Sequence, residues 1–555
     1  MLVGRWSRGA RLLALWSAAI LVGACLPQEA PPPDNFVGLK SAAEKIAKER
    51  AAERAKATPT PAPTPQPAPA VGPQAPHRLT VQEAILMGME NNLSLEVERF
   101  KPAIQRTVED QQRAVFDPTL KSGLSASRTR ARQIPEPTTG HKISDTRTLE
   151  GGVEIDQFLP TGTTIAAQAT STLTHAFSDR RADTRVGLTV TQSLLQGYGM
   201  EVNLASLRQA RLDTQISEYE LRGFAEALLA AIEETFWDYS LALRQIDIVT
   251  ESLKLAEKQM SDTQVRIKFG KLADTELAAA EAEVARRRSE LILARTSLAR
   301  TRLALLRLLN PAGADIWTRD VSIDVPASLP DTTLDDVEAH AKVGLAMRPD
   351  LNEARLRVLR GDLDVVRTKN GLLPKLDAFI TLGKSGYARS FGGSLRDFDG
   401  PSYDATVGVT FEQALGNRDA KAQYQRANIT RRQLLESVDN LAQTVQVDVR
   451  TAYVEANSSK EQIAATAATR KLQEEVLRSE TEKLNVGKST TFLVAQAQRD
   501  LLLSQLAEVQ AKVNLLKNIV ELFRLEGSLL ERRGIAAPGR KTVDMNPPKE
   551  WGFRN

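Results

Sequence analysis

Two long stretches of the chain carry an unbroken helical pattern of apolar and polar positions. They run from about residue 203 to Lys268 and from about Asp419 to Asn485. At 1.5 Å per residue, about 66 residues form a rod of roughly 100 Å. A glycine follows each stretch, Gly270 or Gly487, and a second helical pattern begins after it. Because glycine readily ends a helix in the left-handed conformation, the pattern predicts two long helical hairpins with these glycines at their tips.

The second helix of each hairpin carries heptad seams. The first runs to Leu309 and has an apolar residue every seven positions, at Leu277, Val284, Leu291, Leu298 and Leu305. The other, expected to end at about Leu530, has two such seams: Leu502, Val509, Leu516 and Phe523, and Leu506, Val513 and Val520. Two seams on one helix predict neighbours on two sides, as in a closed ring of helices.

A shorter helical region and then period-two patterns precede each hairpin. Thr80 and Glu83 have the spacing of a capping box, and helices are expected to about Met89 and from Leu95 to Val115. In the second half, Arg348 to Leu351 lead a helix to Gly371. Alternating apolar and polar residues then predict strands at about 119–132, 147–158, 163–177 and 184–195, and later at 376–382 and 407–411.

These two halves form an internal repeat. Ala210 matches Ala427, Phe236 matches Tyr453 and Gly270 matches Gly487, always at a sequence offset of 217, so the hairpins align without gaps. Upstream, Pro118 matches Pro374 at an offset of 256, and Gln192 matches Gln413 at an offset of 221. Between these two positions the first copy is therefore longer by 256 − 221 = 35 residues. We expect an extra β-hairpin there. The predicted units are a first repeat at 79–310, a linker at 311–333, a second repeat at 334–530 and a tail at 531–555.

The N-terminal segment 1–78 predicts export and tethering. Arginines and a short apolar run at 1–24 have the layout of an export signal, and Cys25 after Leu21-Val-Gly-Ala resembles a lipobox, which predicts lipid attachment at Cys25. An ordinary secretory signal with an incidental cysteine is the alternative. Cys25 is the only cysteine, so no intrachain disulfide can form. The stretch 25–78 is rich in proline and alanine, which is typical of an extended tether.

Charge and motifs argue against several function classes. The formal charge is +4, and without Arg5, Arg8 and Arg11 it is nearly balanced, which disfavours a nucleic-acid partner. The four histidines lack the paired spacing of a metal site, and no phosphate-binding loop or nucleophile–base arrangement is evident. We therefore expect no enzyme, no metal and no cofactor. No apolar run of about 18 residues follows the signal, so membrane entry would require lipid or a closed β-barrel.

The duplicated order of helices, strands, long helix, glycine turn and helix resembles the TolC-like outer-membrane efflux proteins, in their lipoprotein branch. The likeness rests on Arg348-Pro-Asp-Leu351, Leu373-Pro-Lys-Leu376, Val190-Thr-Gln-Ser-Leu194 and the two Gly-Lys turns. It implies a mainly α fold with a β-barrel portion: long antiparallel helical hairpins form a tunnel, and trimerisation completes the transmembrane strands. It further implies a homotrimer in the outer membrane that extends into the periplasm and works with a periplasmic adaptor and an inner-membrane transporter.

The resemblance also suggests where partners bind. In the family the hairpin tips meet the adaptor and constrict the tunnel, which carries over to Arg266, Phe269, Gly270 and Lys271, and to Val486, Gly487, Lys488 and Ser489. The alternative is that these are simply turn residues. Glu276 matches an acidic aperture position, or it is a solvated helix charge. Leu493 and Gln496 stand where the second copy would carry acids.

Two functional hypotheses remain from the sequence. The first is a passive outer-membrane channel of a tripartite efflux or type I secretion system, and the second is a periplasmic coiled-coil lipoprotein scaffold without a pore. Arg128, Arg130 and Arg132 fall on one face of a predicted strand, where they would line a pore, meet anionic lipid headgroups or end in solvent. Six strands instead of the family's four leave open whether the extra hairpin enlarges the barrel. Substrate and pump are not readable from the sequence.

Overall fold

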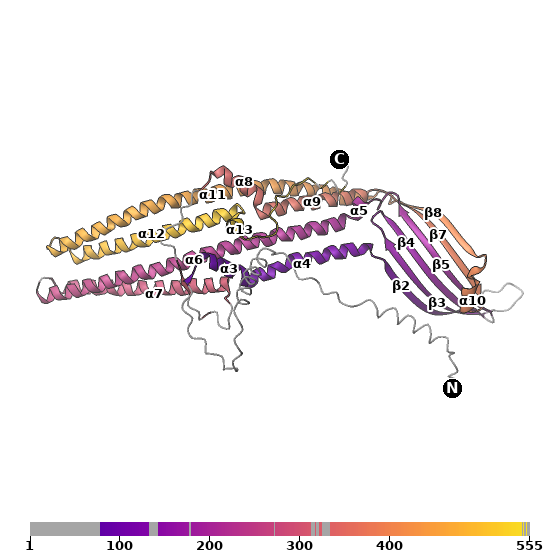
Figure 1. The fold of residues 1–555 in the computed structure, drawn as a ribbon, viewed down its shortest axis with the longest axis horizontal. Helices are drawn as coiled ribbons and strands as arrows, with labels where there is room; N and C mark the ends of the chain where they lie inside the picture. Colours follow the sequence, from indigo (N-terminus) through magenta and orange to yellow (C-terminus); the bar gives the residue numbers. More distant parts are fainter. Residues whose placement is uncertain are drawn as a thin grey trace, which may run out of the picture.

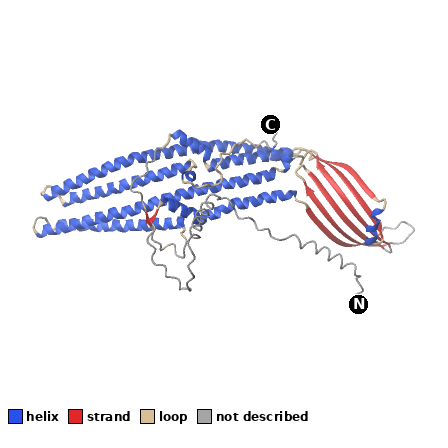
Figure 2. Cartoon of the chain, viewed as in Figure 1, coloured by secondary structure: helices blue, strands red, loops and turns tan. Residues whose placement is uncertain are grey.

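The computed structural model describes residues 78–132, 143–176, 179–270, 272–311, 317, 321–324, 334–546, 548 and 551. The molecule is elongated, with a long helical bundle at one end and a twisted sheet at the other (Figures 1 and 2). The predicted signal at 1–24, Cys25, nearly all of the tether at 25–78, Lys271 and most of the linker at 311–333 lie outside the described residues.

The elements follow the predicted order in both repeats. In the first repeat they are α3 (Val81–Asn91), α4 (Leu93–Arg113), β2 (Thr119–Arg132), β3 (Ile143–Phe158), β4 (Thr163–Ala176), β5 (Asp179–Ser193), α5 (Met200–Asn203), α6 (Ala205–Lys268) and α7 (Thr275–Leu309). In the second they are α8 (Val337–Met347), α9 (Pro349–Asn370), β7 (Lys375–Ala388), α10 (Phe391–Arg396), β8 (Tyr403–Glu412), α11 (Arg418–Asn485), α12 (Thr491–Leu525) and α13 (Leu529–Arg532). A two-stranded parallel ladder of β1 (Arg78–Leu79) with β6 (Ser322–Ile323) joins the start of the first repeat to the linker.

The duplication predicted from the sequence is confirmed element by element. The predicted upstream offset of 256 relates both bounds of α8 to those of α3, and it also relates both bounds of β7 to those of β2. The capping box is also present, since the Thr80 hydroxyl accepts from the Glu83 amide while the Glu83 carboxylate accepts from the Thr80 amide.

The helices form a curved wall built around the two longest ones. Toward the tips, α6 packs against both α7 and α12, and α12 packs against α11. Toward the sheet, α6 packs against α4 and α9, and α9 packs against α11 (Figure 1). The junction of α7 with α3 and α4 is closed by two hydrogen bonds, from Asn310 Nδ2 to the Asn91 carbonyl (2.9 Å) and from Asn92 Nδ2 to the Leu308 carbonyl (3.0 Å). The two-sided packing predicted for α12 is confirmed.

The largest apolar core lies midway along the wall, where helices of both repeats meet. Phe236 of α6 is fully buried there and contacts Trp237 edge to face, with ring centroids 5.4 Å apart. Leu229 and Ile232 of α6 are buried in the same cluster, as are Val445 of α11 and Leu522 of α12. This core fixes the two hairpins to each other far above their tips. None of the described helices carries an apolar stretch long enough to cross a bilayer.

One boundary differs from the sequence prediction. The last long helix was expected to continue to about Leu530, but α12 ends at Leu525. Gly527 takes a φ of +70°, and a Cβ on it would lie 2.9 Å from the Arg348 Cα. The chain turns there to pass close to the α8–α9 junction and then forms the short α13. A close backbone approach of this kind leaves no mark on the heptad pattern.

All six predicted strands lie in one sheet. Its order is β2-β3-β4-β5-β7-β8, and every neighbouring pair is antiparallel. Two strands, β2 and β5, correspond to β7 and β8 of the second copy, so the extra hairpin predicted for the first copy is β3–β4. This hairpin is inserted in the middle of the sheet, between β2 and β5.

Candidate functional site

The two hairpin tips have the geometry predicted from their glycines. Gly270 and Gly487 both take left-handed backbone conformations, with φ of +67° and +76°. The residue before each glycine is apolar and extends into solvent: Phe269 is 76% exposed and Val486 is 69% exposed. The tips are therefore structured turns that present one apolar side chain each at the far end of the molecule from the sheet (Figure 1).

Two hydrogen bonds tie the hairpins to each other near the tips. Arg266 at the end of α6 donates from Nη2 to Asn485 Oδ1 of α11 at 2.7 Å. Glu276 in the first turn of α7 accepts a hydrogen bond from the Thr491 hydroxyl at the start of α12. We call these two contacts the tip latch. Glu276 is thus half-buried within the protomer and holds a partner there, while its role at an aperture stays a prediction.

The second tip is also braced internally. Lys488 donates its amide to the Lys483 carbonyl at 2.8 Å, and the Ser489 hydroxyl donates to Glu480 Oε2 at 2.7 Å. Hydrogen bonds from Lys483 and then Ser489 lower the pKa of the Glu480 carboxyl, which favours its charged form. Lys488 and Ser489 therefore help to shape their own turn, which is part of the role expected of turn residues.

The sequence does not predict the roles of Asn485 and Thr491. Their partners lie 219 and 215 residues away in the chain, on the other hairpin. The offset of 217 aligns Asn485 with Lys268 and Thr491 with Asp274, so the latch residues have no equivalents in the other copy. No local pattern points to them, because the contacts depend on how the two hairpins pack.

The sheet has one apolar and one polar face, and its register decides which residues share a face. Directly paired residues lie on the same side of a sheet, so Leu120, Ile155, Ala167, Leu188 and Leu382 form one row across five strands. We call this side the apolar face. Its side chains are left open to solvent in the single chain; Leu124 of β2 is 80% exposed and Val407 of β8 is 77% exposed.

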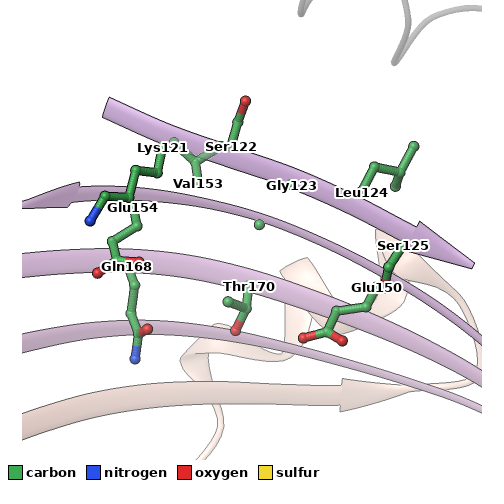
Figure 3. A pocket seen from close by; sticks show the side chains of 11 residues that line it. Lys121, Ser122, Gly123, Leu124, Ser125, Glu150, Val153, Glu154, Gln168 and Thr170 are labelled. Atoms are coloured by element: carbon green, nitrogen blue, oxygen red, sulfur yellow. The ribbon is translucent and has the colours of Figure 1, made fainter. Parts of the chain in front are cut away.

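On the opposite side, which we call the polar face, glycine, threonine and charged residues dominate. Gly123 and Gly152 are paired there, and the absence of side chains leaves a hollow of about 510 Å³ over β2, β3 and β4. Lys121, Glu150, Glu154, Gln168 and Thr170 surround it (Figure 3). A polar face opposite a continuous apolar face is the arrangement of a barrel wall between lipid and water.

Arg128 and Arg130 lie on the apolar face, at the end of the sheet farthest from the helices, and the side chain of Arg132 is not among those that the structure describes. Arg128 pairs across the ladder with Arg147 and forms an ion pair with Asp145, with Nε at 2.9 Å from Oδ1. Arg130 occupies the same face one step further along β2. Of the three placements considered for these arginines, lining a pore does not fit this face. The headgroup region of a lipid layer and a solvated strand end both fit it, and the choice between them stays a prediction.

Comparisons with known proteins point to one family. Residues 343–528, which cover most of the second repeat, match the family described as outer membrane efflux protein. Outer membrane efflux protein BepC of Brucella suis biovar 1 (strain 1330) is 25% identical over 382 residues, which span 66% of this chain and 75% of BepC. The second repeat thus matches the outer membrane efflux protein family, and the chain as a whole is similar to one of its members.

Solved structures show that this chain shares the fold of known outer-membrane channels. The outer-membrane channel OprN superposes with a TM-score of 0.61 at 17% identity and covers 81% of this chain and 90% of its own. The CmeC outer membrane channel of Campylobacter jejuni gives a TM-score of 0.60 at 15% identity, covering 81% of this chain and 86% of CmeC. The expected fold, a mainly α structure with long helical hairpins and a β-barrel portion, is confirmed.

The two flanks of the helical wall carry apolar stripes. On α4, exposed Leu93, Val97, Phe100 and Ile104 recur at spacings of four and three, on the side opposite the buried Leu95. On the other flank, α11 exposes a similar stripe opposite its buried valines: Ile429, Val447, Val454, Leu472 and Val476. At about 100° per residue, each stripe lies along one face of its helix. Both stripes face away from the chain's own core.

Proposed function

We propose that the protein is the outer-membrane channel of a tripartite efflux or type I secretion system. It would act as a passive conduit across the outer membrane and the periplasm, and its partners would supply the energy. The observation that carries this proposal is the two-faced sheet with both edges open, continuous with a helical wall whose two flanks are apolar. Each of these surfaces is incomplete in one chain and is complemented by the opposite flank of another copy.

The edge strands support self-association of this kind. β2 leads away from the helices and β8 leads back to them, so β8 of one copy and β2 of the next would pair antiparallel, like all other pairs of the sheet. An open edge leaves unpaired amides and carbonyls, which a bilayer does not tolerate. Six strands are too few to enclose an aqueous pore. Closure by copies satisfies both requirements.

Three copies are favoured by the family resemblance. In such a trimer, the apolar stripe on α4 of one copy lies on the flank that faces α11 of the next. The same closure turns the polar face of the sheet toward the lumen and the apolar face toward lipid. The protein would then sit in the outer membrane with the tips in the periplasm.

The tips are the proposed docking site for a periplasmic adaptor, which would join the channel to an inner-membrane transporter. The exposed Phe269 and Val486 offer apolar anchors at the accessible end of the tunnel. Arg266 and Glu276 would hold the tip latch closed in the absence of partners. We further propose that export removes residues 1–24 and that acyl chains on Cys25 anchor the mature chain, with residues 25–78 as its tether.

Conductance of the purified protein in planar bilayers tests this function. We expect discrete single-channel steps whose size increases when the tip latch is broken. A folded oligomer that inserts into the bilayer and conducts in neither the wild-type nor the latch-broken form would support the alternative, a periplasmic coiled-coil scaffold without a pore.

A further inference from the structure

The inserted hairpin β3–β4 lies where it would change the width of the pore. We propose that it is a structural part of the barrel wall and that three copies of this chain close a barrel of eighteen strands. The outer-membrane section of the conduit is then wider than the twelve strands of β2, β5, β7 and β8 would allow. This inference rests on the proposed function, and it specifies how the conduit is built.

The pairing of the hairpin is complete on both sides. Every residue of β2, from Thr119 to Arg132, has a partner on β3, and every residue of β4, from Thr163 to Ala176, has a partner on β5. β3 and β4 pair with each other from Thr146 to Phe158. If the hairpin folded over the sheet or into the lumen, these ladders would be lost, and β2 and β5 would have to pair with each other instead.

The hairpin also continues both faces of the sheet without interruption. Leu149, Val153 and Ile155 of β3 are exposed on the apolar face, in line with exposed leucines of β2 and β5. On the polar face the same strand carries Glu150 and Glu154. A hairpin that plugged a pore or packed on its rim would have no reason to keep a lipid-compatible face. Alternation of this kind is the sequence signature of a membrane-spanning strand.

The occupant of the open edges is a second copy of this chain. β2 and β8 are the only unpaired edges of the described sheet, and they run in opposite directions. Each also carries exposed apolar residues on the same face as the rest of the wall: Leu120 and Leu124 on β2, and Val407, Val409 and Phe411 on β8. Joining them continues both the antiparallel order and the apolar face from one copy to the next.

The expected width follows from barrel geometry. Strands lie about 4.8 Å apart and tilt by about 40°, so eighteen strands close at a backbone diameter of about 36 Å, against about 24 Å for twelve. The helical wall gains no element from the hairpin. The barrel would therefore be the wide part of the conduit, and the helical tunnel and its tips would limit passage.

Deletion of the hairpin tests the inference. β2 ends and β5 begins at the same end of the sheet, so residues 133–178 can be replaced by a short Gly-Ser turn that joins Arg132 to Asp179. The probe is polyethylene glycol of graded size, added to one side of a planar bilayer while single-channel conductance is recorded. We expect the largest polymer that enters the wild-type pore from the sheet side to have a radius at least about 1.5-fold larger than in the deletion variant.

Two controls distinguish the effect of barrel width from the effects of luminal charge and of the hairpin tips. The double variant Glu150→Gln and Glu154→Gln changes the luminal charge without changing the strand number, and it should keep the wild-type size limit. Polymer added from the tip side should give the same limit in all three proteins. If polymers added from the sheet side had the same size limit in the wild type and in the deletion variant, the inference would be overturned, and the proposed channel function would still stand. Loss of conductance in the wild type would instead count against the channel itself.

Cross-linking tests the closure between β2 and β8 that the eighteen-strand barrel requires, and it does not depend on the deletion variant folding. Cysteines at Leu124 of β2 and Val407 of β8 in one chain would be bridged between copies by a bis-maleimide, in a background where Cys25 is replaced by serine. We expect covalent dimers and trimers on denaturing gels. A variant with only Leu124→Cys is the matched control. Exclusively monomeric chains after reaction would contradict closure through these edges.

Discussion

The exposed stripe on α4 yields the sharpest prediction, because its residues contribute little to the fold of one chain. Val97 is 63% exposed and Ile104 is 62% exposed in the single chain, on the side of α4 opposite its buried Leu95. Replacing both by serine should leave each protomer folded and weaken the contact with the neighbouring copy. The proposed trimer would then dissociate more readily.

The magnitude follows from the exposed fractions. Full burial of a valine or isoleucine side chain contributes about 1.5–3 kcal/mol, so burying about three fifths of each contributes about 1–2 kcal/mol. The two substitutions therefore remove about 2–4 kcal/mol at each interface. Since about 1.4 kcal/mol corresponds to a tenfold change, each interface should weaken at least about thirtyfold.

Native mass spectrometry of the detergent-solubilised protein over a dilution series measures this change. The matched control is Lys101→Ser with Asp110→Ser, two exposed positions on the same helix away from the stripe, whose ion pairs with Glu98 and Arg113 are solvated and worth little. We expect monomers to appear at higher concentration in the stripe variant than in the control. Identical dissociation of the two variants would refute the assignment of α4 to an interface.

Four further predictions concern the tips and the core. Arg266→Ala removes the hydrogen bond to Asn485, which is worth about 1 kcal/mol per copy, and it should raise single-channel conductance. Lys254→Ala removes an ion pair within α6 and should leave the conductance unchanged. Phe269→Ser with Val486→Ser should weaken adaptor binding at least about tenfold in co-purification titrations, while Leu86→Ser, exposed on α3, should leave it unchanged. Burial raises the pKa of Glu226 to about 8, although the nearby Arg222 lowers it. Between about pH 4.5 and 8 the folded state therefore keeps a proton that the unfolded chain releases, so the stability of the fold should decrease as the pH rises through this range. Glu226→Gln should flatten this dependence of Tm on pH. Phe236→Ala should lower the free energy of unfolding by about 3–5 kcal/mol in denaturant titrations, and a loss below about 1 kcal/mol would show that the mid-wall core is not tightly packed.

Much of the fold follows from patterns that are local in the sequence. The period of apolar residues separates strands from helices, the Thr80–Glu83 spacing marks a helix start, and the offset of 217 aligns the two glycine turns. Each of these features depends on neighbouring residues or on a direct comparison of two copies. They were sufficient to predict the order of elements, the six strands and the extra hairpin.

Other features depend on packing between distant segments and were not predictable. The turn at Gly527 exists because the chain passes the backbone of Arg348, and the tip latch exists because the hairpins lie side by side. Arg222 and Glu226 look like solvated charges of a long helix, yet both are buried, where the Arg222 guanidinium lies 2.7 Å from the Glu531 carboxylate and 3.0 Å from the Gly527 carbonyl. Helical periodicity alone does not reveal that α13 covers these two side chains.

The central claim is that copies of this chain close around a continuous lumen. Electron cryo-microscopy of the full-length protein in lipid nanodiscs tests it most directly. We predict three copies, with β8 of each paired to β2 of the next inside the lipid disc and one uninterrupted passage from the sheet to the hairpin tips. A particle in which the sheet stays open or lies outside the lipid would contradict the account.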